Sequence, residues 1–144
     1  EVRESERRAR GAEPVCVATP VARLGLSICY DLRFPELYRA LTRLGGEVLC
    51  VPSAFTAPTG AAHWDVLVRA RAIENQCYVI APNQIGPTAQ GHADYGHSSI
   101  VDPWGTVIAR ASDSECVITA EIDLDLLAEV RAQLPCLEHI QLRA

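Results

Sequence analysis

Short apolar runs, separated by proline, glycine and polar residues, divide this chain into strand-sized segments. Runs of this length that are rich in branched side chains predict buried strands. They occupy residues 15–19, 24–29, 48–51, 77–81 and 116–122. A further pair, residues 98–101 and 106–109, flanks Asp-Pro-Trp-Gly, a turn sequence that predicts a hairpin.

Apolar residues at helical spacing predict three helices, at residues 35–44, 63–76 and 124–134. Pro35 suits the first turn of a helix, and the Asp123 side chain can cap the last one. Early strands that alternate with helices imply parallel pairing, and the later strands form antiparallel hairpins. The fold class is therefore α/β. The polar stretch 83–95 is expected to be a long loop, and loops of that length are often functional.

The composition is that of one ordinary domain with a packed core. The chain has 144 residues, of which 49% are hydrophobic and 22% are charged, and its formal net charge is −5. A domain with this charge has no electrostatic basis for binding nucleic acid or an anionic membrane, and no apolar run is long enough to span a bilayer. Neither is an expected partner.

Methionine and lysine are both missing. Without lysine these residues can supply neither a P-loop lysine nor a Schiff base. The missing methionine predicts a piece of a longer polypeptide. The charged first residues are unlike a secretion signal, and the six cysteines form no close-spaced framework. We therefore expect reduced thiols in a cytoplasmic protein.

Cys29 ends an apolar run, and charged residues and Phe34-Pro35-Glu36 follow it, which predicts a helix start. A thiol at the end of a strand and beside a helix N-terminus is favoured as a thiolate, the nucleophilic form. The alternative is a buried structural cysteine, because free cysteine is among the most buried residue types. The local pattern leaves both interpretations equally open. The other five cysteines lie in apolar surroundings and are expected to be structural: Cys16, Cys50, Cys77, Cys116 and Cys136.

Two other hydrolase classes find little support. A serine hydrolase of the G-x-S-x-G type is not indicated, because neither Ser27 nor Ser98 has the flanking glycines. A zinc enzyme is not indicated either, since His92 and His97 have poor ligand spacing and no C-x-x-C is present. We expect no metal and no cofactor.

Residues 29–36, Cys-Tyr-Asp-Leu-Arg-Phe-Pro-Glu, resemble the nucleophile motif of the nitrilase superfamily of carbon–nitrogen hydrolases. Further segments resemble that family in the same order, at residues 52–55, 63–64, 69–75, 96–98 and 102–105. Within the family the sequence is most similar to the Nit branch and its deaminated glutathione amidases. The segments that point to this branch are Thr59-Gly60, His63-Trp64 and residues 74–79.

The resemblance implies a four-layer α-β-β-α sandwich with mixed sheets, usually paired into dimers through sheet extension. Residues 1–144 would form a single partial domain, the C-terminal half of that sandwich. Half a sandwich leaves an apolar sheet face uncovered. The family's general-base Glu and its Lys come from segments upstream of the nucleophile strand and would be absent. Glu4, in a Glu-Ser pair, resembles a further Glu that some members use in catalysis.

The resemblance also implies hydrolysis of a non-peptide amide bond in a small molecule, such as deaminated glutathione, through a thioester on Cys29. The backbone N–H of Tyr30 would donate to the oxyanion. These 144 residues alone are expected to be inactive, because the upstream Glu and Lys would be missing. The alternatives within the family are an ω-amidase and an N-carbamoyl hydrolase. An alternative of another class is a non-catalytic binding or assembly protein that retains the fold.

Five residues are expected to bind substrate: Tyr30, Arg33, Ala54, Phe55 and His63. Arg33 can bind a carboxylate, but an ion pair with Asp31 or Glu36 is the favoured alternative. Ala54 and Phe55 follow a strand end, where α/β folds build pockets, and core packing is equally open. His63 lines the site or caps a helix. Tyr95 and His97 are expected to be structural rather than catalytic. A solvated or dimer-facing ion-pair face is expected for Arg69, Arg71 and Glu74, which have helical spacing.

Overall fold

The sheet at the centre of the molecule has six strands, and three adjacent ones, β2, β3 and β4, are parallel. The computed structural model describes residues 9–89 and 91–142. The sheet order is β1 (Val15–Ala18), β2 (Arg23–Leu26), β3 (Val48–Cys50), β4 (Tyr78–Ala81), β7 (Ser99–Val101) and β8 (Val107–Arg110). The strands outside the parallel trio pair antiparallel. This mixed sheet confirms the predicted α/β class.

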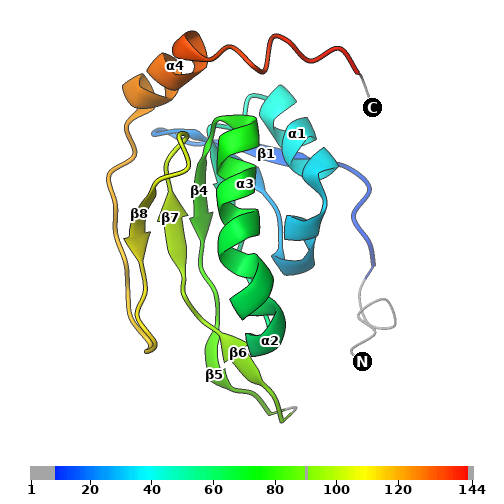
Figure 1. The fold of residues 1–144 in the computed structure, drawn as a ribbon. Coiled ribbons are helices and arrows are strands. Elements are labelled where there is room, and N and C mark those ends of the chain that lie inside the picture. Colours follow the sequence, from blue (N-terminus) through cyan, green and yellow to red (C-terminus); the bar gives the residue numbers. More distant parts are fainter. Residues whose placement is uncertain (1–8, 90, 143–144) are drawn as a thin grey trace.

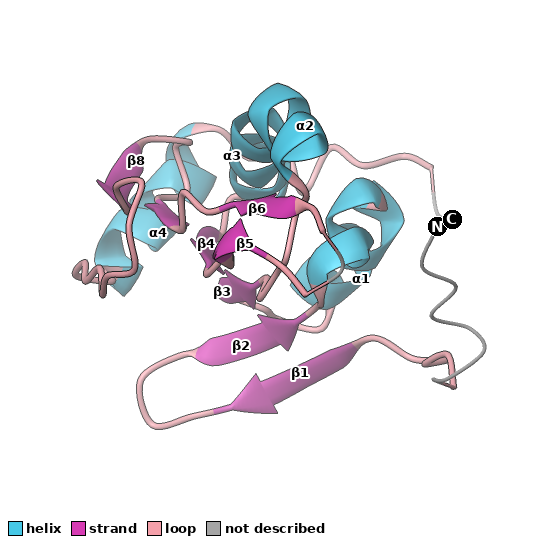
Figure 2. Ribbon diagram, turned by 90° about the horizontal axis from the view of Figure 1, so that it is seen from below, coloured by secondary structure: helices cyan, strands magenta, loops and turns pink. Residues whose placement is uncertain are grey.

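Helical connections join the parallel strands, as parallel pairing requires. β2 leads into a 3₁₀ helix, Cys29–Arg33, which we call the cysteine helix, and then into α1 (Pro35–Arg43). β3 leads into α2 (Ala57–Thr59), a π-helical turn (Gly60–Trp64) and α3 (Asp65–Asn75). Figure 2 shows that α1, α2 and α3 all lie on one side of the strands.

Two elements lie at opposite ends of the molecule (Figure 1). The hairpin of β5 (Ile85–Pro87) and β6 (Ala93–Tyr95) forms one end. The helix α4 (Leu124–Gln133) lies at the other, and the Asp123 carboxylate accepts from the first free N–H groups of this helix, as predicted.

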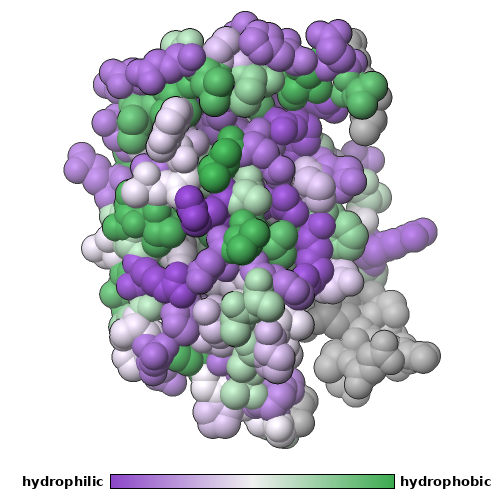
Figure 3. Space-filling view, in the orientation of Figure 1, coloured by the Kyte–Doolittle hydropathy of each residue, from purple (hydrophilic) through white to green (hydrophobic). Residues whose placement is uncertain are grey.

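The core lies between the sheet and the helices α1 and α3. Side chains alternate along a strand, so Leu49 of β3 and Val79 of β4 point to this side and are fully buried. Tyr38 and Leu41 of α1 and Trp64 before α3 meet them there. Hydrophilic and hydrophobic side chains are intermixed on the outer surface of this side (Figure 3).

The opposite face of the sheet is covered only in part. Leu127 of α4 packs against Val48 and Tyr78 at the start of the parallel strands. Nearer their carboxyl ends the face is open, and Val15 and Leu26, which are paired neighbours, expose 49% and 41% of their surface. This open apolar face agrees with the predicted half of a sandwich.

Three predicted elements differ from the observed ones. Residues 116–122 form no strand: they lie outside both sheets, and Val117 is 90% exposed. The predicted loop 83–95 contains the β5–β6 hairpin instead. The strand predicted at 24–29 ends at Leu26, because the chain turns into the cysteine helix.

Candidate active site

The carboxyl ends of the three parallel strands meet at one edge of the sheet. Their hydrogen bonds continue beyond the strands: the N–H of Cys29 donates to Pro52 O (2.9 Å) and the N–H of Ser53 donates to Pro82 O (2.9 Å). Cys29 therefore lies beside the segment after β3, which lies beside Asn83 after β4. In α/β folds, ligands bind at such carboxyl edges.

Cys29 occupies a strained turn. Its φ is +45°, a left-handed conformation that a non-glycine residue adopts at a cost of about 1–3 kcal/mol. The turn is held by Asp31, whose carboxylate accepts from Ile28 N (2.9 Å) and whose N–H donates to Ile28 O (2.9 Å). The side chain is partly exposed. Cys29 is thus the first residue of the cysteine helix, and its partly exposed side chain also packs against the hydrophobic core.

The two N–H groups at this turn differ in what they can bind. The N–H of Cys29 is already used by Pro52 O. The N–H of Tyr30 lies in the first turn of the cysteine helix, where backbone donors have no acceptor inside the helix. The Tyr30 N–H is therefore suited to an oxyanion that forms next to the Cys29 sulfur.

Three of the other predicted substrate-binding residues lie around the guanidinium of Arg33. Its Cζ lies 5.6 Å from the centre of the Tyr30 ring and 5.2 Å from that of Phe55. Its Nη1 lies 3.3 Å from His63 Nδ1, which must accept, because a guanidinium has no acceptor. Within residues 9–89 and 91–142, Arg33 forms no ion pair with Asp31 or Glu36. The favoured alternative for Arg33 was therefore wrong.

The other predicted pocket residues have different surroundings. Phe55 is 4% exposed and packs on Trp64, with ring centres 5.0 Å apart, so it belongs to the core and also supports Arg33. Ala54 is exposed beside it. His63 is exposed in the π-helical turn rather than capping α3. Glu4 lies outside the described residues.

Asn83 organises the neighbouring loops, and sequence reasoning missed it. Its side chain is buried and accepts from Phe55 N (3.0 Å), while its Nδ2 donates to Gly96 O (2.7 Å). The N–H of Tyr95 adds a bond to Phe55 O (2.8 Å). An asparagine directly after a strand and a proline was the available signal. Asn83 fixes the segment on which the Arg33 side chain lies.

Arg71 is not on a solvated face. It is 4% exposed, and its Nε and Nη2 both donate to Leu32 O of the cysteine helix, at 3.0 and 2.7 Å. Its Nη1 donates to Glu74 at 2.8 Å. Arg69 instead donates to Gly105 O (2.8 Å). The predicted ion pair with Glu74 is present, but the expectation of a solvated face was wrong for Arg71, because α3 turns this residue towards the cysteine helix.

The comparisons with known proteins agree with these observations. The family described as carbon-nitrogen hydrolase matches residues 1–132. The chain belongs to the carbon–nitrogen hydrolase family. A deaminated glutathione amidase from Bos taurus is 54% identical over 123 residues, which are 85% of this chain and 38% of that protein. The chain thus spans well under half the length of this relative.

Solved structures of this family have the same fold. The NitFhit protein of C. elegans matches with a TM-score of 0.93 and 49% identity, covering 97% of this chain and 34% of that one. An amidase variant from Nesterenkonia sp. AN1 matches with a TM-score of 0.72 and 28% identity, covering 89% of this chain and 50% of that one. That structure is described as showing Michael addition of acrylamide at the active site cysteine.

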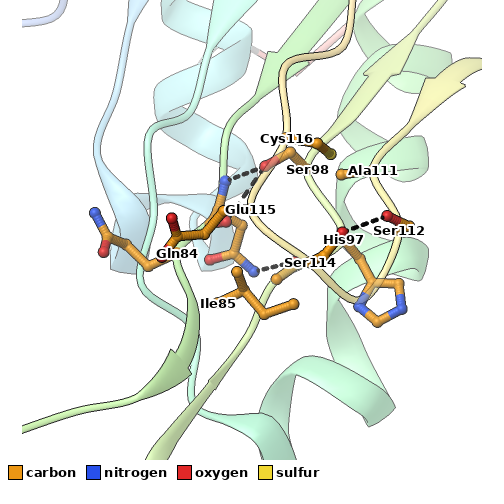
Figure 4. A pocket seen from close by; sticks show the side chains of 11 residues that line it. Gln84, Ile85, His97, Ser98, Ala111, Ser112, Ser114, Glu115 and Cys116 are labelled. Atoms are coloured by element: carbon orange, nitrogen blue, oxygen red, sulfur yellow. Dashed lines mark hydrogen bonds between the residues drawn. The ribbon is translucent and has the colours of Figure 1, made fainter.

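A hollow of about 230 Å³ is lined by none of the predicted site residues (Figure 4). Its walls come from the loops around Asn83, Ser98 and Glu115. It is smaller than the mostly apolar clefts of about 300–1,000 Å³ that hold small ligands. Cys116 at its edge is exposed, so the expectation of an apolar environment was wrong for that residue.

Two further features of the described segments bear on cofactors and membranes. In residues 9–89 and 91–142, no three His, Cys, Asp or Glu side chains are grouped so that they could hold a metal ion. No helix in these segments has the length and apolar character needed to cross a membrane.

Proposed function

We propose that this chain carries the nucleophile of an amidase, and that the nucleophile is Cys29. The observation behind this proposal is the strained turn, in which the partly exposed Cys29 precedes Tyr30, whose N–H has no acceptor inside the cysteine helix. A strained strand-to-helix turn is also how other hydrolases expose a nucleophile. The name of the Bos taurus relative and the description of the Nesterenkonia structure support the proposal.

The reaction begins when the Cys29 sulfur attacks the amide carbon. A C–S bond forms, the carbonyl electrons move to oxygen, and the Tyr30 N–H donates to that oxyanion. The C–N bond then breaks, and the leaving nitrogen takes the proton that the Cys29 thiol gave up and departs as ammonia or an amine. Water finally attacks the thioester, which releases the acid and regenerates the thiol.

We propose a substrate amide that bears a carboxylate, and deaminated glutathione is the compound that the relative's name gives. Arg33 is the binding residue, because its guanidinium lies between two rings with no acidic partner among the described residues. A guanidinium binds carboxylates through two parallel hydrogen bonds. Phe55 and His63 orient it, and Ala54 leaves space beside it.

We further propose that residues 1–144 are one part of a larger catalytic domain. The open sheet face around Val15 and Leu26 would pack against a second sheet, which also brings the general-base Glu and the Lys that the family uses. Glu4 would join them. The parent protein would be a dimer or higher oligomer, and the six free cysteines of residues 1–144 suit the reducing cytoplasm.

The decisive experiment compares the parent protein, extended upstream to include the missing half, with its Cys29→Ser variant. Deaminated glutathione is the substrate, and ammonia or amine release is the signal. We expect loss of turnover in the variant, and a thioester mass adduct on a peptide containing Cys29 in the wild type after acid quench. Turnover by the variant would refute the nucleophile. An inactive wild type that still binds the compound would favour a binding protein.

A second comparison tests whether residues 1–144 contain every group that the reaction needs. The 144 residues alone should show no turnover under conditions where the parent protein is active, because losing even one oxyanion donor costs on the order of 10²–10³ in rate. Robust turnover by the short chain would show that no upstream residue is needed.

A further inference from the structure

The cysteine helix is hydrogen-bonded to a buried guanidinium, that of Arg71. Arg71 of α3 directs two N–H groups at a single carbonyl, that of Leu32, at 3.0 and 2.7 Å. Leu32 is the fourth of the five residues in the cysteine helix, and it is fully buried. The carbonyl groups near the end of a helix lack intrahelical donors. Arg71 therefore caps the helix that begins with Cys29.

Other contacts fix the orientation of the Arg71 side chain. Its third donor group, Nη1, bonds to Glu74 at 2.8 Å, and its Cζ lies 5.3 Å from the centre of the Tyr38 ring. The Glu74 carboxylate also accepts from Asn75 at 3.4 Å. The guanidinium is thus held on three sides, so it is a fixed support and not a mobile surface charge.

The remainder of the turn is held at its other end. Cys29 has the left-handed backbone conformation, and such strain persists only where the surroundings impose it. Upstream, Ser27 is bonded to Cys50 O and to Tyr38. Downstream, the Leu32 carbonyl is bonded only to Arg71 among the side chains of the described residues. Arg71 is therefore the downstream anchor of the strained segment.

We propose that Arg71 is a positioning residue for the reaction at Cys29. Its hydrogen bonds to the Leu32 carbonyl hold the cysteine helix in place, and with it the relative positions of the Cys29 sulfur and the Tyr30 N–H. Arg71 touches no substrate. The proposal rests on Cys29 being the nucleophile. Lysine cannot replace arginine here, because an ammonium lacks the planar fork that directs two parallel N–H groups at one oxygen.

The test uses the parent protein and its Arg71→Lys variant. Small displacements of reacting groups lower rates strongly, so we expect kcat to fall on the order of 10–100-fold while KM changes little. Alkylation of Cys29 by iodoacetamide should also become slower, or its rate should depend on pH in a different way. Peptide mass spectrometry measures this rate, and near-ultraviolet circular dichroism checks that the variant is fully folded. Arg69→Lys, two residues earlier on α3, is the matched control and should retain wild-type kcat.

A second variant covers the case in which Arg71→Lys fails to fold. Glu74→Gln changes a partly exposed residue and removes only the ion pair that orients Arg71. It should also lower kcat, by a smaller factor than Arg71→Lys. Wild-type kcat in a folded Arg71 or Glu74 variant, or an equal loss in the Arg69 control, would overturn the proposal. The Cys29→Ser variant separates this from the proposed function: if it remains active, the nucleophile itself is wrong.

Discussion

The hydroxyl of Tyr38 donates a hydrogen bond to the hydroxyl of Ser27, across 2.8 Å of the buried core. The direction follows from Ser27, whose only hydroxyl proton is used to donate to Cys50 O at 2.9 Å. Burial raises the pKa of Tyr38 to about 12, so the phenol keeps its proton. This pair ties α1 to the chain two residues before Cys29.

Replacing Tyr38 with phenylalanine tests this bond. Tyr38→Phe should lower the free energy of unfolding by about 1 kcal/mol, the usual net contribution of one hydrogen bond. Urea denaturation of the parent protein at pH 7 measures it. Thr42→Val is the control. It removes another hydroxyl of α1, one turn later, which donates to the Tyr38 carbonyl, and so reports the effect of losing a hydroxyl elsewhere on this helix.

The same variant should change the alkaline stability profile. A raised pKa in the folded state favours the neutral phenol, so its contribution is full below pH 10 and is lost as the pH rises from 10 to about 12. Burial also raises the pKa of Cys77 and Tyr78, which titrate in both proteins. The difference between wild type and Tyr38→Phe should therefore shrink above pH 10. A constant difference up to pH 11.5 would contradict the raised pKa.

Arg33 should control the recognition of a substrate carboxylate. Arg33→Met removes a charge-assisted hydrogen bond worth about 1.5–3 kcal/mol, so KM for a carboxylate-bearing amide should rise on the order of 10–100-fold. KM for a neutral amide of the same size should change little. Steady-state kinetics on the parent protein measure both, with Arg43→Met at the end of α1 as the control. An equal effect on the two substrates would mean that Arg33 only maintains the shape of the pocket.

How far the sequence could predict this site depends on the range of each contact. The position of Cys29 at a strand end and the helix start at Pro35 are local, and both were predicted, although the exact turn was not. The role of Arg71 depends on a contact with a residue 39 positions away. Its spacing with Arg69 and Glu74 resembled that of any solvated helix face, because periodicity does not say which neighbour a helix packs against.

The β5–β6 hairpin escaped prediction for a related reason. Its strands are three residues each, too short for an alternating pattern, and several of their bonds go to distant segments. Thr56 bridges to Asp94, and Tyr95 N donates to Phe55 O. Conversely, residues 116–122 have the composition of a strand, but no neighbouring strand in the described sheet pairs with them. In both cases the presence or absence of a neighbouring strand determines whether the segment forms a strand, and composition does not report that neighbour.

Asn83 should be important for stability because its side chain satisfies two buried backbone groups. Asn83→Ala leaves Phe55 N and Gly96 O unpaired, and each such loss costs about 1–3 kcal/mol. Urea denaturation should therefore show a loss of about 2–6 kcal/mol. Gln84→Ala, at the next and exposed position, should change the midpoint little. A small effect of Asn83→Ala would mean that water or the relaxed loop replaces both bonds.

Gly60 gives a prediction that runs against helix propensity. Its backbone is right-handed helical, with φ −62° and ψ −51°, so alanine there would be expected to stabilise the turn by about 1 kcal/mol. A Cβ at this position, however, would lie 2.2 Å from Tyr95 Cβ and 2.3 Å from Tyr95 Cγ. The Tyr95 Cβ is bonded directly to the backbone of β6, so no rotation of the Tyr95 side chain removes the contact with Cβ. Gly60→Ala should therefore destabilise the protein by about 1–3 kcal/mol, the usual cost of overpacking. Thermal denaturation measures it, with Ala61→Gly as the control that reports propensity alone at an exposed position. A stabilised Gly60→Ala variant would mean that the β5–β6 hairpin moves freely relative to the π-helical turn.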